Sequence, residues 1–258
     1  MKKVFIVILI IVNLISCFSL LNRPNNSNNS VVEPLEEPKI TIASPVDDSI
    51  PEWRIGYRIY WHYENLQIPK HYWKSIIEEL QLFADDVYVF SGNGLRVSID
   101  VFDMDVRDFP GEVPSDDLFE IEFPKDTSTF QRLGKYNSVF FSFPWLGPIY
   151  QGVAHPLSDY SAATFPMGLD KEGEWVIPWE LLFLHEFLHL VVGHYSEIEW
   201  PEDDVHGAEV NGYVSDYPMV DPDYFSDMMQ GKVIVGRKKT GILPEQYGDF
   251  GLPFENQY

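Results

Sequence analysis

The chain has 258 residues, of which 45% are apolar and 15% aromatic, so it can form the packed core of one large domain or two small ones. Its 18 basic and 40 acidic residues give a formal net charge of -22. Such an acidic surface repels phosphate groups, which excludes nucleic acid and anionic lipid headgroups as expected ligands and favours cationic or neutral partners. The single cysteine, Cys17, excludes a fold held together by disulfides.

The N-terminus has the pattern of a secretory signal. Residues 1–16 read MKKVFIVILIIVNLIS, with two lysines before an apolar run. The end of this segment, Leu14-Ile15-Ser16-Cys17, resembles the lipobox of bacterial lipoproteins. In that family the peptide is cut before the cysteine and the thiol carries lipid, so the resemblance implies a protein anchored outside the cell, to the bacterial membrane. A plain membrane anchor is the alternative, although the apolar run is short for a span of about 20 residues.

Residues 17–50, which begin with the lipidated cysteine, are predicted to form a disordered tether. From residue 22 onward the segment is rich in Asn, Ser and Pro and has no sustained apolar period. Such a composition cannot bury enough apolar surface to fold. Globular composition begins near residue 51, so we expect one folded domain over residues 51–258.

The folded domain is predicted to be α+β. Four strands are indicated by aromatic and β-branched runs or by alternation, and they cover residues 54–63, 95–104, 138–143 and 150–155. We expect the last of these strands at a sheet edge. Apolar residues at helical spacing predict a helix over residues 69–90. Residues 106–136 show no clear period.

A second helix is predicted over residues 178–192. Pro178 suits its first turn, and Gly193 suits the position just past its end. Apolar side chains surround the helix axis, so the helix should be buried on most sides. It nevertheless contains three titratable side chains, and burying these without partners or a ligand is unfavourable.

The three titratable side chains are His185, Glu186 and His189. Residues four apart on a helix lie about 40° apart around the axis and about 6 Å along it, so both histidines can bind one metal ion. Glu186 is rotated by about 100° from His185 and can reach a water at that ion. This HExxH arrangement resembles the signature of the zincin metallopeptidases. The resemblance implies Zn2+, a twisted mixed sheet with a buried active-site helix, and Glu186 as general base. The alternative is a pair of satisfied core histidines.

A catalytic zinc usually has three protein ligands, so one more is needed. The metzincin pattern fails, since Tyr195 stands where its third histidine would be. We favour His206, in the stretch PEDDVHGAEVNGY, over Glu209, whose spacing resembles the thermolysin-like branch. In that branch an aspartate follows four residues later, where this chain has Tyr213. A mixed arrangement is also open, with Glu209 bonded to the second ring nitrogen of His206. The remaining candidates are His194, Glu197 and Asp204.

Residues further along the chain offer weaker candidates. Residues 226–231 resemble the methionine turn of metzincins, but we favour Met228 and Met229 as core residues. His155 could line the cleft, but is expected to be an ordinary residue. Candidates for stabilising an oxyanion are Tyr213, Tyr217 and Tyr224.

The sequence as a whole predicts a lipid-anchored zinc endopeptidase, monomeric, that acts on peptide or protein substrates outside the cell. An edge strand would hold the substrate by strand addition. One alternative is a non-catalytic binding or adhesion lipoprotein with a structural metal site; Glu186 argues against it, since such a site needs no base. Another is a zinc site closed by four ligands, His185, His189, His194 and His206.

Overall fold

The computed structural model describes residues 37–45, 48–113, 121–146, 152–156, 161–213 and 221–249. The chain divides into two compact units, Met1–Pro34 and Leu35–Tyr258, and every described residue belongs to the second. The predicted signal segment, Cys17 and most of the predicted tether therefore lie outside the described residues. Among the helices of the described ranges, none has the length and apolar character needed to cross a membrane.

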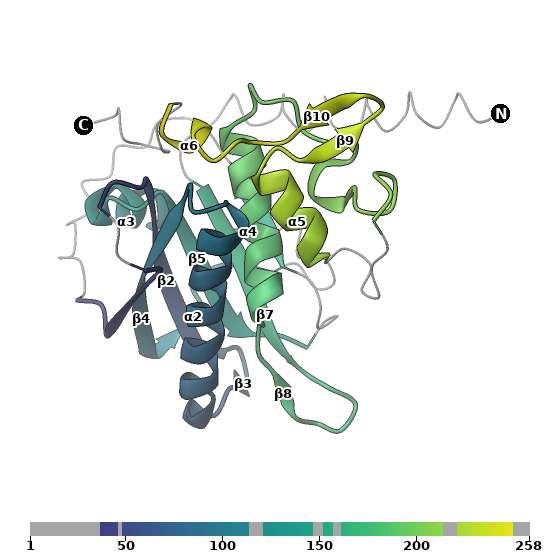
Figure 1. Ribbon diagram of the computed structural model, residues 1–258. Helices are drawn as coiled ribbons and strands as arrows, with labels where there is room; N and C mark the ends of the chain where they lie inside the picture. The colour runs from purple at the N-terminus through teal and green to yellow at the C-terminus, as the bar shows by residue number, and fades with distance from the viewer. Residues whose placement is uncertain are drawn as a thin grey trace, which may run out of the picture. The chain divides into compact units, whose positions relative to one another are not determined.

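The fold is α+β and is built on a twisted mixed sheet (Figure 1). Its strands are β1 (Ile40–Ala43), β2 (Glu52–Tyr63), β3 (Leu66–Gln67), β4 (Arg96–Asp108), β5 (Ser138–Pro144), β6 (Val153–Pro156), β7 (Ser161–Leu169) and β8 (Trp175–Val176). The strand order is β1-β4-β2-β5-β7-β6, while β3 pairs with β2 and β8 pairs with β7. Strands β4, β2, β5 and β7 are parallel to one another, and β1 and β6 are antiparallel to their neighbours. The antiparallel strand β6 ends the order on the side of β7.

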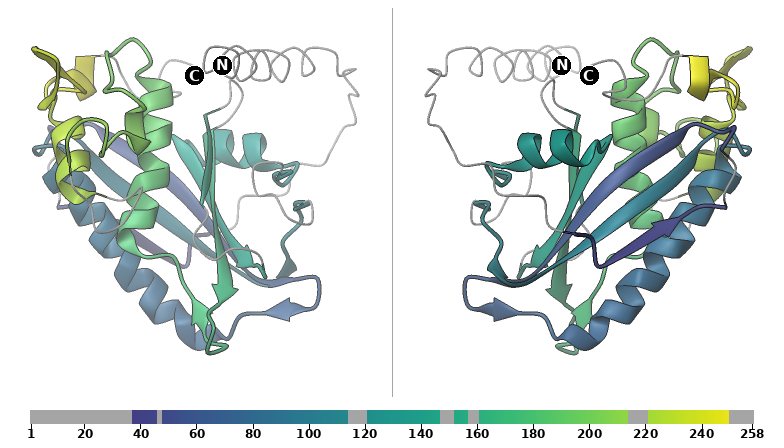
Figure 2. Two further views of the ribbon diagram at one scale, coloured as in Figure 1. Left: turned by 90° about the vertical axis from the view of Figure 1, so that its right-hand side faces the viewer. Right: turned by 90° about the vertical axis from the view of Figure 1, so that its left-hand side faces the viewer.

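Helices cover both faces of this sheet. The helical elements are η1 (Lys70–Tyr72), α2 (Trp73–Phe90), α3 (Thr127–Gly134), α4 (Glu180–His194), η3 (Asp204–His206), α5 (Pro222–Met229) and α6 (Gln246–Asp249). Helices α2 and α4 lie on one face, and α3 lies on the other (Figure 2). A separate antiparallel hairpin, β9 (Val233–Val235) and β10 (Lys238–Thr240), follows α5.

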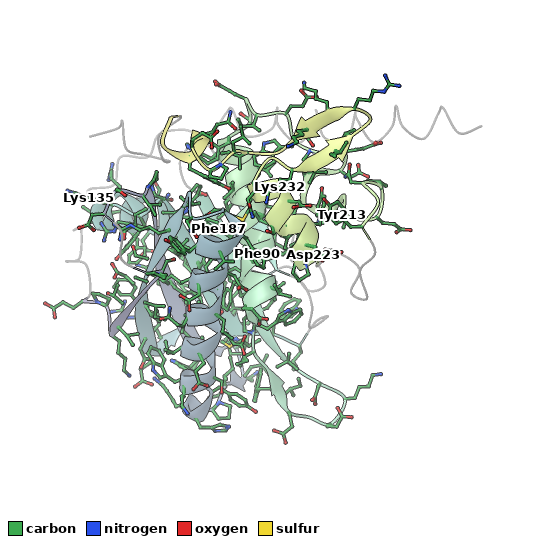
Figure 3. All side chains as sticks on the ribbon, in the orientation of Figure 1. Phe90, Lys135, Phe187, Tyr213, Asp223 and Lys232 are labelled. Carbon is green, nitrogen blue, oxygen red and sulfur yellow. The ribbon has the colours of Figure 1, made fainter. Side chains whose placement is uncertain are left out.

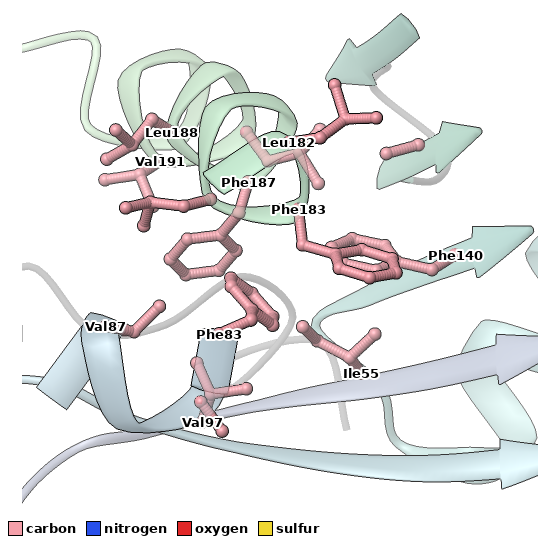
Figure 4. Packing of buried hydrophobic residues seen from close by; sticks show 14 of the residues in the cluster. Ile55, Phe83, Val87, Val97, Phe140, Leu182, Phe183, Phe187, Leu188 and Val191 are labelled. Atoms are coloured by element: carbon pink, nitrogen blue, oxygen red, sulfur yellow. The ribbon is translucent and has the colours of Figure 1, made fainter. Parts of the chain in front are cut away.

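An aromatic cluster holds α4 against α2 and the sheet (Figure 4). The ring centroid of Phe83 on α2 lies 5.9 Å from that of Phe183 and 5.6 Å from that of Phe187. Phe183 also stacks on Phe140 of β5, with centroids 6.5 Å apart. Residues two positions further along a helix point about 200° away around the axis. The packing of Phe183 and Phe187 therefore turns His185 and His189 away from this core.

The opposite face of the sheet has its own core, which α3 covers. Phe130 of α3 packs edge-on against Phe102 of β4, with ring centroids 5.1 Å apart. Arg58 of β2 lies over the Phe130 ring at 3.8 Å and pairs with Asp126 at 2.9 Å. This second core contains no part of the histidine-bearing helix.

Most predicted elements are confirmed. The strands expected at residues 54–63, 95–104 and 138–143 are β2, β4 and β5, and the expected edge strand is β6. The helix expected over residues 69–90 is η1 followed by α2.

Several elements were not predicted, among them β1, α3 and β7. The tether was expected to extend to residue 50, but Ile40–Ala43 forms β1 and pairs with β4, from Ile40 opposite Val101 to Ala43 opposite Ser98. Helix α3 lies in the segment that shows no clear period, and β7 contains Pro166, which argues against a strand because proline lacks an N–H.

The ends of α4 also differ from the prediction. Trp179 is its N-cap, so Pro178 precedes the helix instead of standing in its first turn. The helix continues through Gly193 to His194, where the backbone N–H of Tyr195 still donates to Val191 O at 2.9 Å. Gly193 therefore does not end the helix.

Candidate metal centre

Helix α4 presents the side chains of His185 and His189 one turn apart. Their Nε2 atoms lie 3.3 Å apart, and the rings meet nearly edge to face. His185 is only 3% exposed. Burial, with a smaller contribution from His206, lowers the pKa of His189 to about 4, which favours the neutral imidazole that metal binding requires.

His206 completes a triangle of ring nitrogens. It is the last residue of η3, and its Nε2 atom lies 3.2 Å from the Nε2 atoms of both His185 and His189. These three side chains form a group that could hold a metal ion. His206 is exposed, so the group lies where the buried helix reaches the surface.

The triangle fits a metal ion better than it fits hydrogen bonding. A neutral imidazole has one N–H, so three ring nitrogens this close together cannot all donate to one another. In a tetrahedral site with metal–nitrogen distances of about 2.0–2.1 Å, two ligand nitrogens lie roughly 3.3 Å apart. The observed separations of 3.2 and 3.3 Å match that spacing.

The other candidate ligands lie outside this triangle. Glu209 and Glu197 are exposed, and neither they nor Asp204 belong to the three-histidine group. His194 lies nine residues after His185, which places it about 180° around the helix. Its ring packs against Trp53, with centroids 5.8 Å apart. The structure thus places His206 beside His185 and His189. It does not place His194 with them, as the four-histidine alternative requires.

Glu186 is buried between α4 and the edge strand β6. Its side chain accepts the backbone N–H of Ala154 and is only 4% exposed. Burial raises the pKa of Glu186 to about 8, against the opposing effect of that hydrogen bond. A methyl group on Gly152, the residue before β6, would lie 2.4 Å from Glu186 Cγ, so the backbone there approaches this side chain closely.

A tightly folded loop carries His206. The Asn211 side chain donates to Glu202 O at 2.9 Å and to Gly207 O at 2.7 Å. A methyl group on Gly207 would lie 2.0 Å from Glu202 O, so this position has no room for a side chain. Sequence reasoning missed Gly207 and Asn211, although the His206-Gly207 pair is a local signal for a close backbone approach.

Helix α5 lies beside His185, and Figure 3 labels Asp223 on this helix and Tyr213 next to it. The ring of Phe225 lies 6.0 Å from that of His185. Met228 and Met229 are fully buried and belong to this helix, which confirms them as core residues and not a methionine turn.

The tyrosine hydroxyls have other partners. Tyr213 donates to Asp227 Oδ2 at 2.7 Å, and Tyr224 donates to the backbone oxygen of Asp204. Tyr217 lies outside the described residues. His155 packs against Phe123 at 5.1 Å, in the core on the opposite face of the sheet. His155 is therefore not part of the metal centre.

The region around the site is uniformly acidic. From Glu172 to Gly231 the sequence has no lysine or arginine but fourteen aspartate and glutamate residues. This stretch includes α4, the His206 loop and α5. Such a charge distribution attracts cations, both metal ions and positively charged ligands.

Comparisons of this chain with protein-family models, with curated proteins and with solved structures find no match.

Proposed function

We propose that the protein is a zinc-dependent endopeptidase of the zincin type that hydrolyses peptide bonds. The observation that carries this proposal is the convergence of His185, His189 and His206 with a buried carboxyl group, Glu186, beside the first of them. Three protein nitrogens are a donor set of catalytic zinc sites, which keep a further position for water or substrate.

The proposed hydrolysis uses a bound zinc ion and the side chain of Glu186 in different roles. Zinc held by the three imidazoles would lower the pKa of water and polarise a substrate carbonyl. Glu186 is proposed to accept the proton of the attacking water and to return it to the leaving amine. Burial raises the pKa of this carboxyl group to about 8, so it can hold a proton near neutral pH, whereas the positive charge of a bound zinc ion would favour the carboxylate that accepts one. The N–H of Ala154 orients the carboxyl group.

Substrate binding is proposed along β6. This strand ends the sheet order and is antiparallel to β7, so an extended peptide can add beside it. Ala154 of β6 donates its backbone N–H to Glu186, and Gly152, the residue before β6, lies against the same side chain. A peptide lying along β6 would therefore bring its backbone close to the proposed base.

The proposed location follows from the N-terminal sequence alone. We propose a monomeric lipoprotein that is anchored through Cys17 to the outside of a bacterial cell membrane. Mass spectrometry of the mature N-terminus tests this part separately, since cleavage before Cys17 and a lipid on its thiol both change the mass.

One experiment tests the catalytic proposal. Bound zinc and hydrolysis of a mixed peptide library are measured for the wild type, Glu186→Gln and Glu209→Ala. We expect stoichiometric zinc in all three proteins and loss of hydrolysis only in Glu186→Gln. Wild-type protein that holds zinc but cleaves no peptide would favour the non-catalytic binding module, and wild-type protein without metal would contradict the proposed centre.

A further inference from the structure

Helix α5 contacts two elements that supply metal ligands. The Tyr224 hydroxyl donates to the backbone oxygen of Asp204, the first residue of η3. The next residue, Phe225, lies with its ring 6.0 Å from that of His185. Adjacent residues of one helix therefore support the His206 turn and the first histidine of α4.

We infer that Tyr224 is a positioning residue that holds His206 in the geometry required for metal binding. This inference rests on the proposed metal centre, but not on the proposed peptide hydrolysis. Tyr224 does not belong to the three-histidine group, and its effect passes through the backbone of Asp204.

The His206 turn combines a short 3-10 helix with an unfavourable backbone conformation. The 3-10 helix has three residues, and its hydrogen bonds run from His206 N to Asp203 O at 2.9 Å and from Gly207 N to Asp204 O at 3.1 Å. Asp203 and Asp204 have φ angles of 58° and 37°, in the left-handed region that is unfavourable for residues with a Cβ atom. A turn with this backbone needs an anchor outside itself.

Tyr224 is well placed to be that anchor. It is fully buried, and its backbone N–H donates at 2.8 Å to Asp221 Oδ1, which caps the start of α5. A methyl group on Gly207 would lie 2.8 Å from the Tyr224 oxygen, so the hydroxyl lies against the turn on both sides of His206. The Asn211 side chain, which bonds two backbone oxygens of the loop, also hydrogen-bonds the Tyr224 hydroxyl.

The inference predicts a selective effect of removing one hydroxyl. Tyr224→Phe keeps the buried ring and removes the hydroxyl with its bonds to the His206 loop, at Asp204 O and the Asn211 side chain, so circular dichroism is expected to show a folded protein. Zinc affinity, measured by competition with a chromophoric chelator, is expected to fall about 10- to 100-fold, the usual effect of losing a group that orients a metal ligand. The visible absorption of the Co2+-substituted protein, which reports ligand geometry, is expected to change as well.

Tyr195→Phe is the matched control. Tyr195 is 2% exposed and its hydroxyl also donates to a backbone oxygen, that of Tyr247 at 3.2 Å. Removal of this hydroxyl is expected to lower thermal stability without changing zinc affinity or the Co2+ spectrum.

The outcomes separate this inference from the proposed function. Wild-type zinc affinity and Co2+ spectrum in Tyr224→Phe would overturn the inference alone, as would an equal loss of affinity in Tyr195→Phe. Zinc binding that depends on Tyr224, in a protein that cleaves no peptide, would support the inference and contradict the endopeptidase proposal. Wild-type protein that binds no metal would overturn both.

Discussion

The Nε2 atoms of His189 and His206 lie 3.2 Å apart, although 17 positions separate the two residues in the sequence. His189 is held by the packing of α4 on the sheet, whereas His206 is held by a loop that α5 supports. The three-histidine group therefore joins two structural elements, and a metal ion bound there would link them.

The first prediction concerns the third ligand. His206→Ala leaves only the two imidazoles on α4. Zinc affinity is therefore expected to fall by more than the roughly 10- to 100-fold that follows the loss of a residue that orients a metal ligand. Glu209→Ala, on the same loop but exposed and outside the histidine group, is expected to bind zinc as the wild type does. Chelator competition measures both affinities. If only Glu209→Ala lost zinc, the third ligand would be Glu209 and not His206.

The second prediction separates base from ligand. Glu186→Gln removes the proton acceptor but keeps a side chain of the same size, so zinc content should stay at the wild-type value. The rate kcat is expected to fall by about two to four orders of magnitude, the usual contribution of a general base. Zinc analysis and peptide hydrolysis on the same sample measure both quantities. Equal loss of zinc and activity would indicate a ligand or structural role for Glu186.

The third prediction concerns the contact between Gly152 and Glu186. In Gly152→Ala the new methyl group would lie 2.4 to 2.6 Å from three atoms of the Glu186 side chain, so the carboxyl group or β6 must shift. Peptide hydrolysis is expected to fall by at least about tenfold, and overpacking is expected to cost about 1–3 kcal/mol of stability. Zinc affinity should change little, because the three atoms nearest to the new methyl group all belong to Glu186 and none to a histidine.

Gly248→Ala is the control for that substitution. Its methyl group would meet only Pro51 Cγ, at an ordinary contact distance of 3.5 Å, so neither activity nor stability should fall. Wild-type hydrolysis in Gly152→Ala would show that the close approach of Gly152 to Glu186 has no part in catalysis.

The sequence predicts the site better where the signal is local. His185, Glu186 and His189 follow from helical spacing, and the placement of His206 depends on a loop whose fold uses Asn211, Gly207 and Tyr224. No periodic pattern encodes such a loop, because its geometry comes from single hydrogen bonds and from missing side-chain volume. The sequence could therefore rank His206 and Glu209 but could not position them.

In the fold, too, the elements with a strong local sequence pattern were predicted, and those that depend on tertiary contacts were missed. Strands β2, β4 and β5 have long aromatic and β-branched runs, and the sequence predicts them correctly. Strand β1 was missed because its four residues are mostly exposed and gain their structure by pairing with β4. Strand β7 was missed because Pro166 and Gly168 weaken its local preference, whereas burial between β5 and β6 stabilises it.

The last prediction concerns the pH dependence of stability and the carboxyl group of Asp86, which is not one of the proposed metal ligands. Burial, followed by repulsion from Glu180 and Asp85, raises the pKa of Asp86 on α2 from its ordinary value of 3.8 to about 6. A raised carboxyl pKa means that protonation favours the folded state. The stabilising contribution is complete below pH 4 and is lost as the pH rises through about 6. Above that pH the ionised Asp86 destabilises the fold.

Asp86→Asn should therefore raise the melting temperature at pH 7.5 but have little effect at pH 4, because the amide resembles the protonated acid. The effect is expected to be modest, since Asp86 is only partly buried and solvent screens its charge. Glu172→Gln makes the same change in net charge at an exposed position and controls for the overall repulsion of an acidic chain. Melting curves of the three metal-free proteins between pH 4 and 8 give the comparison. A difference between wild type and Asp86→Asn that stays constant with pH, or equals that of Glu172→Gln, would contradict the assigned pKa shift.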